Sequence, residues 1–65
     1  MQMIAIATEY NHTEYVWNQI REIDQQAERM PEGNSARMWV KTSCTVEEIR
    51  ALDKVGDAIL SNVRE

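Results

Sequence analysis

A single cysteine, Cys44, in a chain of 65 residues strongly limits what this sequence can fold into. An intrachain disulfide is excluded because it needs two cysteines, and a closed zinc site needs four ligands where the chain offers only Cys44 and His12. A chain of this length buries only about 60% of its unfolded surface, so small proteins without such supports often self-associate. We therefore expect a single domain, residues 1–65, that forms a homo-oligomer and holds no metal or cofactor.

The excess of acidic over basic residues argues against some classes of binding partner. Seven Lys and Arg residues stand against eleven Asp and Glu residues, which gives this small acidic protein a formal charge of −4. Proteins that bind nucleic-acid phosphates are usually basic, so this balance argues against a nucleic-acid partner. The longest apolar run, residues 3–7, is far shorter than the about 20 residues that span a membrane. The first residues also lack the charged region of a signal peptide, so we expect a cytoplasmic protein with no membrane contact.

Two short strands are predicted from the apolar pattern. Residues 3–8 form a partly β-branched run, and residues 36–42 alternate cleanly between apolar and polar side chains. Ala5 and Ala7 would make one face of the first strand flat, so that another group can approach its backbone closely. The expected faces are Ile4, Ile6 and Thr8 against Met3, Ala5 and Ala7 in the first strand, and Met38, Val40 and Thr42 against Arg37, Trp39 and Lys41 in the second.

An amphipathic helix is predicted between these strands. Apolar residues recur at spacings of three and four from Val16 to Met30, which is typical of one helix face. Asn11 or Thr13 can cap the start of the helix. Pro31 should end it, because the residue before a proline avoids the helical conformation.

A second amphipathic helix is predicted after residue 45. Thr45 and Glu48 have the spacing of a capping box, in which each side chain binds a free backbone N–H group of the first turn. An apolar stripe then continues from Ile49 to Val63. Gly56 lies inside this stripe, where a glycine is unfavourable unless another backbone packs closely against it.

The predicted fold is therefore a small α+β domain with the order β-α-β-α. A crossover helix between the strands would make them parallel, with a right-handed connection. Two strands rarely form a stable sheet alone, and their free edges invite pairing. We expect homodimerisation to complete the sheet, edge to edge.

Cys44 and His12 are the candidates for chemistry. Cys44 precedes a helix, where the helix dipole can lower a thiol pKa, but His12 is the only base available and two glutamates in the first turn would oppose a thiolate. His12 lies near Glu9 and Glu14, so a proton relay or weak metal site is an alternative to a surface histidine. We expect an inert, partly buried thiol, no catalytic residues and no enzyme activity.

Residues 41–45 lead from the second strand into a helix, where backbone N–H groups and Lys41 can hold a phosphate. The glycines of a phosphate-binding loop are absent, so we expect simple capping there. A small nucleotide nevertheless remains an alternative ligand.

Arg37, Trp39 and Lys41 are the main candidate for a partner- or ligand-binding site. They share one strand face, and residues 35–45 contain these two cations and no acidic residue. Tryptophan and arginine often anchor protein partners, and a tryptophan can also stack a nucleobase. In the structural alternative, Trp39 packs under the second helix while both cations reach into solvent.

These surfaces favour binding over catalysis. The first hypothesis is a non-enzymatic regulatory protein that binds a larger protein and inhibits or adapts it, a profile that accessory proteins of phages and mobile elements often have. The alternative is a protein that binds and sequesters a small molecule or nucleotide, with its site at an oligomer interface beside Trp39.

Overall fold

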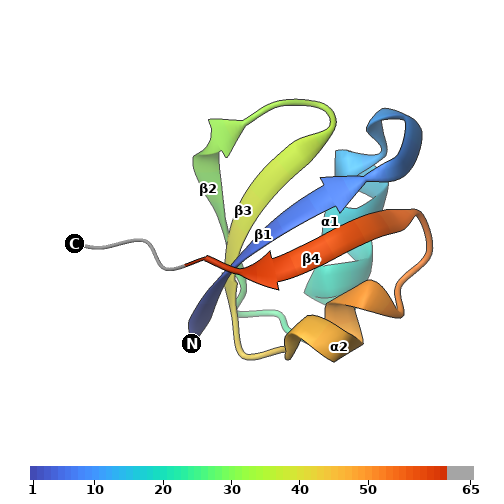
Figure 1. The fold of residues 1–65 in the computed structure, drawn as a ribbon. Helices are drawn as coiled ribbons and strands as arrows, with labels where there is room; N and C mark the ends of the chain where they lie inside the picture. Colours follow the sequence, from blue (N-terminus) through green and yellow to red (C-terminus); the bar gives the residue numbers. More distant parts are fainter. Residues whose placement is uncertain (62–65) are drawn as a thin grey trace.

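The computed structural model describes residues 1–61, apart from the side chain at position 10. Within these residues the chain forms four strands and two α-helices (Figure 1). The elements are β1 (Gln2–Thr8), a 3-10 turn η1 (Glu9–Asn11), α1 (Thr13–Ile23), β2 (Glu28–Gly33), β3 (Arg37–Thr42), α2 (Val46–Arg50) and β4 (Val55–Leu60).

The strands form one sheet in the order β2-β3-β1-β4, and each neighbouring pair is antiparallel. Strands β1 and β2 run in the same direction and are joined through α1, but β3 lies between them in the sheet. This topology is the split β-α-β arrangement. Both helices lie on the same side of the sheet (Figure 1). In the described part of the chain, no helix covers the opposite side.

The core lies between the sheet and the two helices. Strands β1 and β3 contribute alternate residues that are almost completely buried, as the alternation predicts. Helix α1 packs Val16 and Ile20 against them, and the short α2 contributes Ile49. The sheet residues of this core are Ile4, Ile6, Met38, Val40 and Ala58.

The prediction of a helix up to Met30 is wrong. Helix α1 ends at Ile23, and the segment after it pairs with β3 as strand β2, although it contains Pro31. The Asp24 side chain accepts a hydrogen bond from the Gln26 backbone at 3.1 Å, which turns the chain out of the helix. Strand β2 is an edge strand with an irregular register, where a proline is tolerated.

The prediction of a long second helix is also wrong. Helix α2 ends at Arg50, and Lys54 has a φ of 69°, a left-handed conformation that does not continue a right-handed helix. The chain then forms β4 along the free side of β1. Gly56 does meet a close backbone, because a Cβ there would lie 3.3 Å from the carbonyl oxygen of Ala7. Val63 lies outside the described residues.

The predicted sheet layout is therefore corrected. Strands β1 and β3 were expected to be parallel neighbours, but they are antiparallel because β2 intervenes between α1 and β3. The order is β-α-β-β-α-β, and the four strands of one chain complete the sheet without a second copy. The argument that a two-stranded sheet needs a second copy of the chain therefore no longer applies.

The two helix starts differ in how well their caps were predicted. The capping box at α2 is confirmed: the Glu48 N–H donates to Thr45 Oγ1 at 3.1 Å, and the Thr45 N–H donates to Glu48 Oε1 at 2.8 Å. For α1, neither Asn11 nor Thr13 is the cap. The cap residue is His12, which makes no capping bond with its side chain.

Candidate binding face of the sheet

The candidate site lies on the side of the sheet that carries no helix, here called the open face. The strand registers place Trp39 opposite Ala5, and Ala5 opposite Ile59 on the other side of β1. The next row along the strands is built from Arg37, Ala7 and Asp57 in the same way. The open face is formed by Met3, Ala5 and Ala7 of β1, Arg37, Trp39 and Lys41 of β3, and Asp57 and Ile59 of β4.

A shallow hollow of about 180 Å³ lies at the centre of the open face. Ala5 and Ala7 form its floor, and Trp39 and Ile59 stand on either side of them. Trp39 is only partly buried and the exposed fraction of Ile59 is 53%. The expectation of a flat alanine strand face that another group can approach therefore agrees with this geometry.

The charges of the open face differ in how they are compensated. Lys41 stands opposite Glu28 of β2 in the strand register, and Asp57 lies 3.6 Å from Arg50 of α2. Arg37 makes no ion pair with any side chain in residues 1–61. Arg37 is an exposed residue that lines the hollow, so its guanidinium can meet an anionic group without breaking an ion pair.

The structure brings the three predicted residues together. Arg37, Trp39 and Lys41 share the open face because β3 is a regular strand whose other residues enter the core. The alternative, in which a second helix covers Trp39, is wrong. Asp57 and Ile59 complete the site and were missed, because residues 55–60 were assigned to a helix. The β-branched residues of this short segment were the available signal for a strand.

Carboxylate groups of this same chain accept hydrogen bonds from the loop between β3 and α2. The Ser43 N–H donates to Asp24 Oδ2 at 3.0 Å, and the Thr42 hydroxyl donates to the same oxygen at 2.7 Å. These bonds lower the pKa of Asp24, with the hydroxyl of Thr42 as the largest cause and the backbone of Ser43 next. The Glu48 side chain accepts a hydrogen bond from the Thr45 N–H group. The backbone donors considered for a phosphate are thus already bound.

Cys44 is a free cysteine with an exposed fraction of 3%. Its backbone N–H donates to Thr42 Oγ1 at 3.1 Å. The thiol was expected to be partly buried and the residue is almost completely buried, while its inertness stays a prediction.

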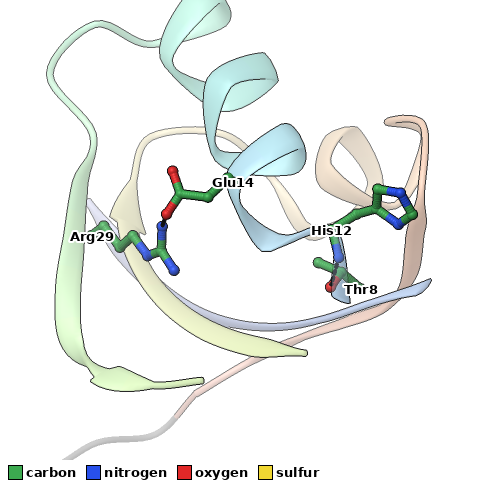
Figure 2. Close-up of polar contacts among 4 residues, drawn as sticks. All are labelled: Thr8, His12, Glu14 and Arg29. Atoms are coloured by element: carbon green, nitrogen blue, oxygen red, sulfur yellow. Dashed lines mark hydrogen bonds and ion pairs between the residues drawn. The ribbon is translucent and has the colours of Figure 1, made fainter. Parts of the chain in front are cut away.

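His12 and its neighbouring glutamates do not form the considered relay. The His12 backbone N–H donates to Thr8 Oγ1 at 3.2 Å, and its ring Nδ1 contacts the backbone oxygen of Glu9. Glu14 instead forms an ion pair of 2.7 Å with Arg29 of β2 (Figure 2). No group of three His, Cys, Asp or Glu side chains suited to a metal ion occurs in the described part of the chain.

Residues 1–61 contain no helix that is long and apolar enough to cross a membrane. Comparisons with protein families, with curated proteins and with solved structures found no match for this chain.

Proposed function

We propose that this protein is a non-enzymatic regulatory protein that binds a larger protein through the open face and thereby inhibits or adapts it. The observation that carries this proposal is the position of Trp39, which stands partly exposed beside a flat alanine floor on the side of the sheet away from both helices. A large aromatic residue at the centre of an exposed apolar surface is typical of a protein interface.

The chemistry around Trp39 supports a protein partner with an acidic group. An apolar side chain of the partner would enter the hollow between Trp39 and Ile59, and a carboxylate beside it would meet Arg37. Arginine and tryptophan lie two residues apart on one strand, a distance of about 7 Å that neighbouring side chains of a partner can match.

The size of the hollow favours a protein side chain over a nucleotide. Pockets for small molecules usually enclose about 300–1,000 Å³, whereas this hollow holds about 180 Å³ and is open to one side. A sequestered small molecule or nucleotide remains the second candidate because Trp39 and Arg37 together offer a stacking surface and a cation. It would need a second wall from another protein molecule.

Affinity capture from cell extract tests the proposal. We expect the wild-type protein to retain a specific larger protein, and Trp39→Ala to lose it. Tyr15→Ala is the matched control, because Tyr15 is an exposed aromatic residue on α1 and should retain the same protein. Equal capture by all three forms would remove the open face from the function.

Tryptophan fluorescence tests the second candidate. The chain has two tryptophans, so Trp17→Phe leaves Trp39 as the only tryptophan reporter. On the protein-binding proposal, titration with nucleotides leaves this signal unchanged. A saturable change would favour the nucleotide site instead.

We also propose that the protein works in the cytoplasm and forms a homo-oligomer. The single buried cysteine suits a reducing compartment. The argument from chain length for self-association still holds, whereas the argument from a two-stranded sheet does not.

A further inference from the structure

Within residues 1–61, the two outer edges of the sheet differ in whether another strand can pair with them. On the β2 edge, the register with β3 shifts between Arg29 and Gly33, and Pro31 has no N–H group to donate. Irregular edges that contain proline resist strand addition. The β4 edge has a regular register with β1 from residue 57 to residue 60 and ends in Ile59 and Leu60, which are 53% and 52% exposed.

The backbone of β4 directs N–H and C=O groups away from β1 at two positions. The Ser61 N–H donates to the Met3 oxygen of β1 at 2.8 Å, which fixes the hydrogen-bonding phase of this strand pair. In an antiparallel pair, residues alternate between bonding to the partner strand and pointing away from it. Ala58 and Leu60 therefore direct their N–H and C=O groups away from β1, toward the free edge.

Two side chains occupy the outward groups of Ala58. The Ala58 N–H donates to Asp57 Oδ1 at 2.9 Å, and Arg50 Nε donates to the Ala58 oxygen at 2.9 Å. Arg50 Nη2 also lies 3.6 Å from Asp57 Oδ1. This arrangement, the Arg50–Asp57 clamp, satisfies both backbone groups that an added strand would need at Ala58.

We propose that β4 is the surface through which two copies of this chain associate, and that the Arg50–Asp57 clamp weakens this association. Two β4 strands can pair antiparallel about a two-fold axis at Ile59, so that Ala58 of each copy faces Leu60 of the other. The exposed Ile59 side chains would then meet across the axis. All four backbone hydrogen bonds of this pairing use the Ala58 groups that the clamp holds.

This partner follows from the chemistry of the edge. The pairing is self-complementary, and the two Asp57 carboxylates do not face each other in this register. It joins two four-stranded sheets into one and leaves both open faces uncovered. The proposal rests on the self-association proposed above and not on a partner that binds at Trp39, although Ile59 borders both surfaces.

Sedimentation equilibrium over a concentration series tests the proposal. The double variant Arg50→Ala/Asp57→Ala removes one cation and one acid, so the formal charge stays at −4. We expect its dimer dissociation constant to fall by roughly tenfold or more relative to the wild type, because Ala58 is freed for backbone pairing. The matched control, Glu14→Ala/Arg29→Ala, breaks the other ion pair at unchanged net charge and should behave like the wild type.

A third substitution identifies the surface. Leu60→Pro, added to the double variant, removes an outward N–H group without breaking a bond to β1, and it should restore the weak association. If the double variant does not fold by circular dichroism, the single variant Asp57→Ala replaces it, because it frees the Ala58 N–H and removes the ion pair that holds Arg50. Unchanged association without the clamp, tighter association in the matched control, or a dimer that persists with Leu60→Pro would each overturn the proposal.

Discussion

The two faces of the sheet use alternate residues of the same strands. On the covered face, Ile4, Met38 and Val40 have exposed fractions of zero. On the open face, their neighbours Ala5 and Trp39 remain partly exposed. Every second residue of β1 and β3 therefore packs in the core and specifies the fold, and the residues between them remain available to contact a partner. Substitutions one position apart on β3 should consequently have opposite consequences for stability and for binding.

The largest expected effect is on the covered face. Met38→Ala should lower the free energy of unfolding by about 2–5 kcal/mol, because it leaves a cavity between the sheet and the helices. Its neighbour Trp39→Ala should cost much less. Urea unfolding followed by circular dichroism measures both. Similar losses at the two positions would contradict the division of the sheet into a structural and a binding face.

The next effect concerns binding at the open face. Trp39→Ala should weaken the captured complex by about 2 kcal/mol or more, as the loss of an aromatic anchor does. The charge-reversing pair Arg37→Glu and Lys41→Glu should still fold, at a small cost because residue 41 then faces Glu28 with a like charge, and it should also lose an acidic partner without opening a cavity. Isothermal titration calorimetry with the captured protein measures both. A folded double variant that binds with undiminished affinity would exclude this face.

The face on β3 was predictable from sequence, whereas its surroundings were not. A period of two in residues 36–42 places Arg37, Trp39 and Lys41 together in any sheet, whatever the neighbours are. The capping box at Thr45 was equally local. Such patterns depend only on residues close together in the sequence, so they can be recognised without knowing the rest of the fold.

The strands β2 and β4 were missed for a different reason. Ala27 and Met30, and later Gly56 and Ile59, are three residues apart, which fits one face of a helix, and segments of six residues are too short for the strand period of two to be distinguished from the helix period. The neighbouring strands decide between them. Asp57 and Ile59 of the candidate site became visible only through their pairing with β1.

A smaller effect should appear at the end of the covered face, where Asp24 ties the end of α1 to Thr42 and Ser43. The pKa of Asp24 is lowered in the folded protein, so its contribution to stability is present above the unfolded value of about 3.9 and is lost as pH falls through the folded value. Urea midpoints measured from neutral pH downward should decline in this acidic range. Asp24→Asn should reduce stability at neutral pH and flatten this decline, and an unchanged profile would show that the carboxylate contributes nothing.

The smallest effect compares two arginines on opposite sides of the sheet. Arg29 is paired with Glu14 at 2.7 Å, whereas Arg37 on the open face has no ion pair within residues 1–61. The Glu14 side chain is 81% exposed, so Arg29→Ala should cost only about 0.2–1 kcal/mol, and the cost should shrink as salt is raised. Arg37→Ala should leave the urea midpoint unchanged at every salt concentration. A salt-dependent loss at Arg37 would mean that its charge already has a partner within the fold, and it would then no longer be free to select an acidic group on another protein.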